Sequence, residues 1–153
     1  MKSAAMRRAR VEDAAQIREL VVSAYAHYPS RIGVRPAPLD LDYATEIAEK
    51  EVWLASIDGE PRGVLVIRCD GERVIVDNVA VAPDAQRSGL GRALLAQAEA
   101  RAAALGAVEL RLLTHELMTE NRRIYERLGW EPIEAPPDER FSRVHFRKPV
   151  SRE

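Results

Sequence analysis

The segment 79-VAVAPDAQRSGLGRALLAQAE-99 constrains the fold more than any other part of the chain. A short apolar run reaches Pro83, a turn with two glycines and two arginines follows, and an amphipathic helix begins at once. Exposed N–H groups at a helix N-terminus favour an anion, and glycines let a bulky anion come close. An ordinary strand-to-helix turn has the same composition. This segment alone supports both interpretations equally.

Periodicity over the whole chain predicts seven strands and four helices. The expected strands are 5–11, 52–57, 63–69, 73–82, 108–114, 130–134 and 141–148, and the expected helices are 13–26, 40–50, 89–105 and 118–128. Asp58-Gly59 and Asp70-Gly71 predict hairpin turns, and Glu12 or Asp13 is expected to cap the first helix. This order predicts an α/β (α+β) fold with a mixed sheet, covered by helices on both faces. We expect a single domain over 1–153.

The charge and cysteine content excludes several classes of protein. The chain has 23 basic and 24 acidic residues, so we expect no nucleic-acid partner and no anionic membrane surface. No apolar run approaches ~20 residues, which predicts no membrane span. Cys69 is the only cysteine, which excludes a disulfide framework and a cysteine-based zinc site and fits a reducing cytoplasm. We expect Cys69 to be buried in its strand, and we expect no metal.

Two familiar phosphate motifs fail on the glycine turn. A P-loop needs a lysine and a hydroxyl residue after its last glycine, but Arg92 and Ala93 follow Gly91. A dinucleotide fingerprint needs a third glycine and an acidic residue on the next strand. The sequence Gly89-Leu90-Gly91 lacks that glycine, and the next strand ends without a carboxylate.

A second segment, 114-THELMTENRRIYERLGWE-131, places Asn121 and Tyr125 on one helix face, with Leu117, Ile124 and Leu128 expected on a neighbouring core face. With this segment, the chain resembles the GNAT family of N-acetyltransferases. The resemblance rests on V-A-V-x-P-x-x-Q-x-x-G-x-G at 79–91 and N-x-x-x-Y-x-x-L-G-W at 121–130. It extends over the whole chain, because the order of elements is similar to that of the bacterial-type family members.

The resemblance implies acetyl-CoA as the co-substrate. The backbone of Val79, Ala80 and Val81 would pair with the pantetheine arm, and Asn121 would bind that arm from the other side. The two central strands, 73–82 and 108–114, would splay apart to admit it. The pyrophosphate would lie on the loop that Gln86 opens, held by the amides of Arg87, Ser88, Gly89, Leu90, Gly91 and Arg92.

The implied reaction is direct attack of a primary amine on the thioester. Tyr125 resembles the family's general acid and would protonate the leaving thiolate. The base stays open. Asp77 is the first candidate, although pairing to an arginine or exposure to solvent is its ordinary alternative, and His115 is the second. A route through water without a dedicated base is the third.

By the same resemblance, the acceptor site is expected around Tyr25, Tyr28, Arg31 and Arg35 and around 134–143. The acceptor would be a small-molecule or peptide amine, and a homodimer is common in relatives. The competing hypothesis is an acyl-CoA-binding sensor or interaction module without catalysis. Release of thiol from acetyl-CoA in the presence of amines discriminates between the two hypotheses.

Overall fold

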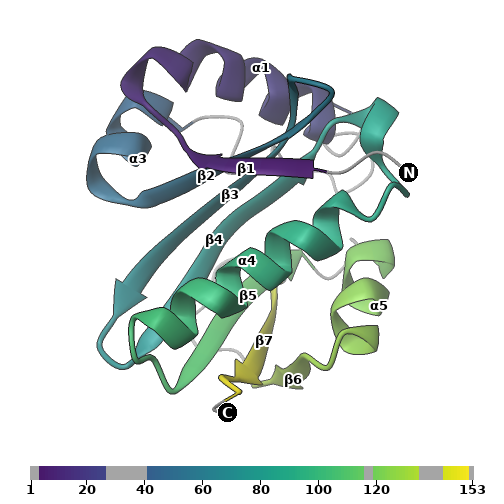
Figure 1. Cartoon of the computed structure of the whole chain (residues 1–153). Coiled ribbons are helices and arrows are strands. Elements are labelled where there is room, and N and C mark those ends of the chain that lie inside the picture. Colours follow the sequence, from purple (N-terminus) through teal and green to yellow (C-terminus); the bar gives the residue numbers. More distant parts are fainter. Residues whose placement is uncertain (1–3, 27–40, 116–118, 135–142, 152–153) are drawn as a thin grey trace.

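The computed structural model describes residues 4–26, 41–115, 119–134 and 143–151. These residues form one seven-stranded sheet in the order β1-β2-β3-β4-β5-β7-β6 (Figure 1). The strands are β1 (Ala4–Arg8), β2 (Glu51–Ile57), β3 (Glu60–Asp70), β4 (Arg73–Val81), β5 (Glu109–His115), β6 (Glu131–Ile133) and β7 (Arg143–Pro149). The α-helices of the described part are α1 (Ala14–Tyr25), α3 (Tyr43–Glu49), α4 (Leu90–Ala104) and α5 (Thr119–Arg127).

The sheet is mixed, as the sequence predicts. Strands β1 to β4 pair antiparallel in chain order, β4 and β5 pair parallel, and β7 pairs antiparallel with both β5 and β6. The hairpin between β2 and β3 turns on Asp58 and Gly59, whose φ angles are 53° and 82°. Two consecutive positive φ angles are what a tight hairpin turn requires.

Helices cover both faces of the sheet and create two hydrophobic cores (Figure 1). The α4 core joins α4 to β3, β4, β5 and β7, and Tyr125 and Leu128 pack at its edge. The α1 core joins α1 and Tyr43 of α3 to β2, β3 and β4. No helix in the described ranges is long and apolar enough to cross a bilayer.

Four side chains differ from expectation. Cys69 is exposed rather than buried, because β3 runs past β2: Glu51, the first residue of β2, pairs with Ile67. Leu105, the last residue of the helix expected over 89–105, lies beyond the end of α4 and is 48% exposed. Ile124 is 45% exposed and does not serve the core. Asp13 precedes α1 without capping it, since its carboxylate accepts hydrogen bonds from Arg7 and from the Arg10 amide.

Replacing Leu94 by alanine is expected to lower the free energy of unfolding by roughly 3 kcal/mol. Leu94 is fully buried in the α4 core. A β-carbon at Gly63 would lie only 2.9 Å from Leu94 Cδ1, so this glycine admits the leucine against β3. Urea denaturation measures the loss. Leu105→Ala is the matched control in the same helix region, and an equal loss in both variants would contradict this packing.

An ion pair ties α4 to the strand β2. Arg101 Nε and Nη2 donate to the two carboxylate oxygens of Glu51 at 2.8 and 2.9 Å, and the Trp53 indole donates to Glu51 at 2.9 Å. The Arg101 guanidinium holds the pKa of Glu51 below its ordinary value, against partial burial, and Trp53 and Arg8 act in the same direction.

A lowered acid pKa stabilises the fold above the ordinary glutamate pKa, and this contribution is lost as the pH falls through the folded-state pKa. Glu51→Gln is therefore expected to lower stability by about 1 kcal/mol near neutral pH. The difference from the wild type should shrink on acidification to about pH 3. Thermal unfolding across this pH range measures it. Glu60→Gln, which changes an exposed pair with Arg62, is the control; a constant Glu51→Gln difference would refute the assignment.

Candidate functional site

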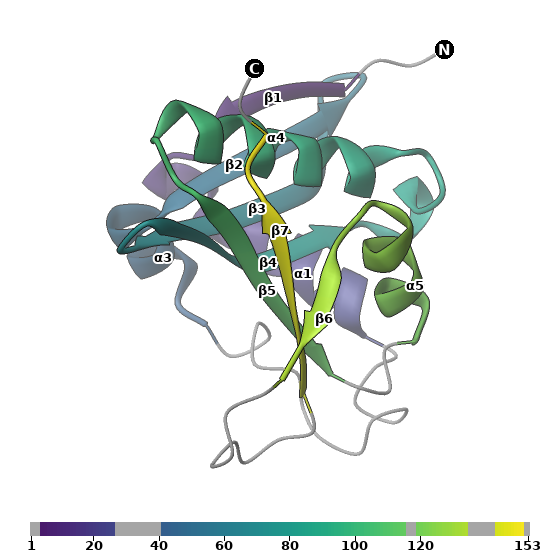
Figure 2. The same ribbon diagram turned by 90° about the horizontal axis from the view of Figure 1, so that it is seen from below.

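The sheet forks between its two parallel strands. Strands β4 and β5 pair from Arg73 and Glu109 to Val76 and Leu112, and the pairing stops there. Beyond this point β4 follows β3 to Val81, while β5 follows β7 to the end of the strand (Figure 2). The expected separation of these two strands is therefore present in the fold.

A β-bulge on β4 lies where the fork begins. Val66 faces Asn78 whereas Ile67 faces Val76, so Asp77 is an extra residue on β4. A bulge bends its strand. Because it adds one residue, the alternation of side chains shifts, and every second residue faces the opposite side of the sheet beyond the bulge. Val74 and Val76 belong to the α4 core, but beyond the bulge Ala80 belongs to the α1 core.

The open edge of β4 offers backbone donors to the fork. The Ala82 N–H donates to the Arg62 carbonyl on the β3 side at 2.7 Å. Because N–H groups alternate between the two edges of a strand, those of Val79 and Val81 point to the edge that β5 has left. This edge has the hydrogen-bonding pattern that an added extended ligand needs.

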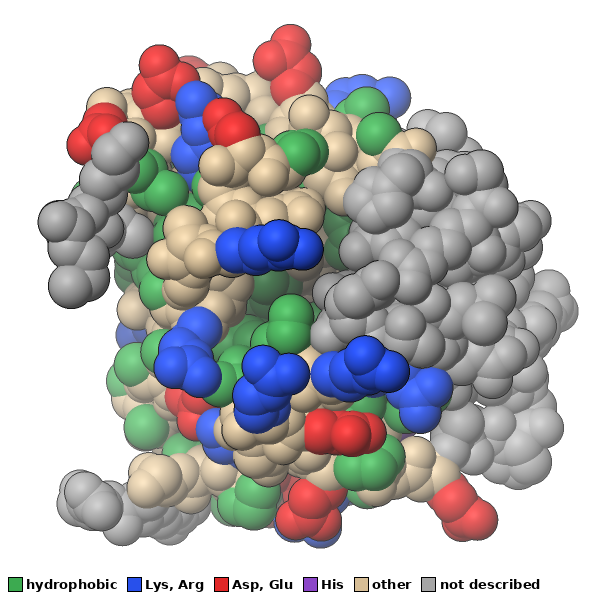
Figure 3. Space-filling model, turned by 90° about the vertical axis from the view of Figure 1, so that its right-hand side faces the viewer, with side chains coloured by type: hydrophobic (Ala, Val, Ile, Leu, Met, Phe, Trp, Pro, Cys, Tyr) green, Lys and Arg blue, Asp and Glu red, His purple; other side chains and the backbone are tan. Residues whose placement is uncertain are grey.

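A cavity of about 530 Å³ lies at the fork. Its wall combines β4, the turn before α4, the N-terminal part of α4, the end of α1, and α5. Figure 3 views the molecule from this side and shows basic side chains gathered around a hollow with hydrophobic side chains in it. No Asp, Glu or His is among the described residues that line the cavity.

The turn before α4 is an amide cradle. Among the described residues, the backbone N–H groups of Arg87, Gly89, Gly91 and Arg92 have no acceptor. Arg87 and Gly89 have φ angles of 69° and 87°, which bend the chain into the helix start. The expected amides of Ser88 and Leu90 are instead hydrogen-bonded within the turn. Free amides close together at a helix N-terminus bind anions. We call these four residues the amide cradle.

Other contacts hold the cradle in place. Gln86 Nε2 donates to the Val81 carbonyl at 3.3 Å, and Ser88 Oγ both donates to the Ala85 carbonyl and accepts from the Leu90 amide. A β-carbon at Gly91 would be 3.8 Å from Val81 Cγ2, an ordinary contact, so internal packing does not require glycine there. Gly91 lines the cavity, and its missing side chain leaves space for a ligand at the amides.

Tyr125 forms part of the opposite wall, on α5. Its ring packs edge-on against Phe146, with centroids 5.6 Å apart, and lies 6.3 Å from the Trp130 ring. The Trp130 amide also donates to the Tyr125 carbonyl at 3.0 Å. A half-buried ring held by two aromatic neighbours has a fixed position at the cavity wall.

The buried side-chain amide of Asn78, which the sequence did not predict as part of the site, positions a second tyrosine, Tyr25. Tyr25 lines the cavity, and its hydroxyl donates to Asn78 Oδ1 at 3.0 Å. Asn78 is 4% exposed, and its Nδ2 donates to the Tyr43 hydroxyl at 3.4 Å. Burial raises the pKa of Tyr43, as does the charge of Glu46, so Tyr43 stays neutral. The sequence did contain an indication: an asparagine in a strand with alternating apolar residues is typical of a buried polar side chain with hydrogen-bond partners.

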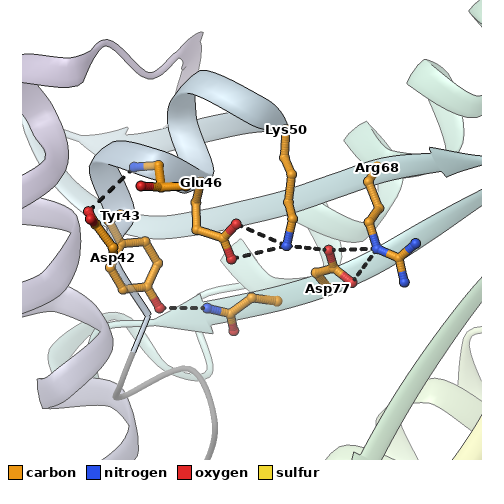
Figure 4. A network of polar contacts seen from close by, with 8 residues as sticks. Asp42, Tyr43, Glu46, Lys50, Arg68 and Asp77 are labelled. Atoms are coloured by element: carbon orange, nitrogen blue, oxygen red, sulfur yellow. Dashed lines mark hydrogen bonds and ion pairs between the residues drawn. The ribbon is translucent and has the colours of Figure 1, made fainter.

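Asp77 does not line the cavity. Its carboxylate accepts hydrogen bonds from Arg68 Nε at 3.0 and 3.1 Å and forms an ion pair with Lys50 at 3.0 Å (Figure 4). Lys50 also binds the buried Glu46 on α3 at 2.9 Å. These contacts brace the bulge against α3, and they match the arginine-paired alternative that the sequence left open.

Five other predicted site residues have little or no described structure. Tyr28, Arg31 and Arg35 lie outside the described residues. His115 ends β5 and Asn121 lies within α5, but their side chains lie outside the described part. In the described ranges, no group of His, Cys, Asp and Glu could hold a metal ion.

The acetyltransferase (GNAT) domain family matches residues 48–132, which is more than half of the 153 residues. The chain belongs to this family of acetyltransferases. The resemblance inferred from the two motifs is thereby confirmed. No curated protein matches the chain in sequence.

Solved structures share the fold over almost the whole chain. A protein assigned to the GNAT family from Desulfovibrio desulfuricans is 24% identical with a TM-score of 0.80, covering 97% of this chain and 100% of its own. The PaiA N-acetyltransferase from Thermoplasma acidophilum, solved in complex with coenzyme A, is 16% identical with a TM-score of 0.83. The match covers 96% of this chain and 99% of that protein. The ribosomal-protein-S18-alanine N-acetyltransferase from Escherichia coli is 19% identical with a TM-score of 0.78, covering 99% and 96%. The predicted mixed fold is confirmed.

Proposed function

We propose that the chain is an acetyl-CoA-dependent N-acetyltransferase that moves an acetyl group to a primary amine of a small molecule or peptide. The fork between β4 and β5 carries this proposal, because one cavity there joins free backbone donors, the amide cradle and Tyr125. The Thermoplasma neighbour, which contains coenzyme A, supports the same donor. Both cores pack on one sheet, which supports one domain over 1–153.

The residues fit coenzyme A. The amide cradle has donors for a diphosphate, Arg87 and Arg92 add positive charge beside it, and Gly91 leaves the amides accessible. The open edge of β4 suits an extended amide-bearing arm, to which Val79 and Val81 would donate. Acetyl-CoA, when bound, supplies an activated acetyl group as a thioester.

The chain's own groups would then act in three ways. A backbone N–H of Val79 or Val81 donates to the oxygen on which negative charge develops. The Tyr125 hydroxyl gives its proton to the departing sulfur. The cavity wall holds the amine close to the reacting carbon, and positioning of this kind supplies much of the rate.

The base is not Asp77 in this proposal, since both of its oxygens are already bound by Arg68 and Lys50. His115, at the end of β5, and a water-mediated route are the two sources that stay open. A pH–rate profile distinguishes them: loss of an ionisation near the ordinary pKa of histidine in His115→Gln would assign the base.

One observation favours the second candidate function, acyl-CoA binding without catalysis. Among the described residues, the cavity wall contains no carboxylate or imidazole to accept a proton. Both functions require coenzyme A, so calorimetric titration with coenzyme A, with ATP–magnesium and NAD as controls, tests the common step. We expect coenzyme A to bind without magnesium, and we expect neither ATP–magnesium nor NAD to bind. Absence of binding would refute both functions.

A further inference from the structure

Three arginines line the cavity without a carboxylate partner among the described residues. Several arginines away from it have carboxylate partners, in the pairs Arg7–Asp13, Arg62–Glu60, Arg68–Asp77, Arg101–Glu51 and Arg111–Glu109. Within the described part, other arginines without such a partner, Arg10, Arg18 and Arg123, are exposed and do not line the cavity. Arg87, Arg92 and Arg127 line the cavity, and none of them has an ion pair or side-chain hydrogen bond within the described part of the chain. The cavity therefore concentrates positive charge that the described protein residues leave unbalanced.

The three arginines come from two sides of the cavity. Arg87 and Arg92 belong to the amide cradle, where donors and charge already match a diphosphate. Arg127 comes from the last turn of α5, together with Tyr125 and Leu128 of the facing wall. Arg127 is therefore a third cation at the site, in addition to the two in the amide cradle, and it lies on α5.

Coenzyme A carries a further anion beyond its diphosphate. Its 3′-phosphate is a monoester with a charge between −1 and −2 near neutral pH, like other phosphate monoesters. A guanidinium binds such a group through two parallel hydrogen bonds, which a lysine does not reproduce. Its charge and its place in the α5 wall of the same cavity make Arg127 the candidate partner of this group.

We propose that Arg127 binds the 3′-phosphate and makes the site prefer coenzyme A to 3′-dephospho-coenzyme A. This inference rests on the proposed function, because it requires the diphosphate to lie on the amide cradle. The competing explanation is structural: a cation in the last turn of α5 also interacts favourably with the helix dipole. That role predicts a change in stability and no change in ligand preference.

Calorimetric titration of each protein with coenzyme A and with 3′-dephospho-coenzyme A tests the proposal. We expect the wild type to bind coenzyme A roughly tenfold more tightly. Arg127→Ala should lose most of that preference by weakening coenzyme A alone, and Arg127→Lys should recover part of it. Arg123→Ala is the matched control, because Arg123 is exposed on the same helix and does not line the cavity.

The other outcomes overturn the proposal in recognisable ways. If Arg127→Ala weakens both ligands equally, Arg127 binds the diphosphate. If it shifts the unfolding temperature and leaves both affinities unchanged, its role is structural. Equal loss of preference in Arg123→Ala would assign the effect to net charge. Failure of the wild type to bind either ligand would also overturn the proposed function, whereas tight binding of both without preference would overturn this inference alone.

Discussion

Tyr125→Phe is expected to lower kcat by roughly a hundredfold to a thousandfold while leaving the affinity for coenzyme A unchanged. The change removes only the hydroxyl, the group proposed to protonate the departing sulfur. The ring contacts with Phe146 and Trp130 are kept, so the cavity wall should not move. Steady-state kinetics and calorimetry on the same preparation measure the two quantities.

Tyr43→Phe is the matched control for this variant. It likewise removes a single hydroxyl, one that accepts a hydrogen bond from Asn78 on β4. Tyr43 does not line the cavity, however. We expect its kcat to change by less than about threefold. If Tyr125→Phe turns over as fast as the wild type, Tyr125 is not the acid and the proton reaches the sulfur from solvent.

Reversing both cradle charges, in Arg87→Glu/Arg92→Glu, is expected to weaken coenzyme A binding by roughly a thousandfold. Two charge-assisted contacts are lost, and two carboxylates then face the diphosphate. Neither arginine has an ion pair within the described residues, so the unfolding temperature should change little. Calorimetry and thermal unfolding test the two parts.

Arg123→Glu controls for the change in net charge, since it places a carboxylate on α5 outside the cavity. It should weaken coenzyme A binding by no more than about threefold at moderate ionic strength, because exposed charges are screened by salt. Wild-type affinity in the double variant would show that the amide cradle is not where the diphosphate binds.

Local chemistry explains what the sequence predicted well. Asp58-Gly59 gave a correct hairpin because two positive φ angles are a property of the dipeptide itself. The amphipathic helix expected over 89–105 is α4, which buries Leu90, Leu94, Leu95, Ala98 and Ala102, because helical periodicity determines which side chains share a face. The glycine turn alone left an anion-binding turn and an ordinary turn equal, and only the resemblance favoured the first.

Long-range geometry explains what the sequence missed. Cys69 is exposed because β3 extends beyond β2, and no pattern near Cys69 gives the relative lengths of the two strands. Asp77, the first candidate for the base, forms a structural ion pair instead, because a bulge places it near Lys50, 27 positions earlier in the chain. Asn78 supports Tyr25, which lies 53 positions earlier in the chain. These contacts depend on strand register and helix placement, which periodicity does not determine.

Amine-dependent release of thiol from acetyl-CoA is the decisive test of the proposed acetyl transfer. The assay follows free coenzyme A with a thiol reagent while amines of different classes are offered, among them amino acids, polyamines and peptides with a free N-terminus. We expect release that requires both wild-type protein and a suitable amine, and that falls in Tyr125→Phe. Tight binding of coenzyme A with no release for any amine would contradict the transferase and support the binding module instead.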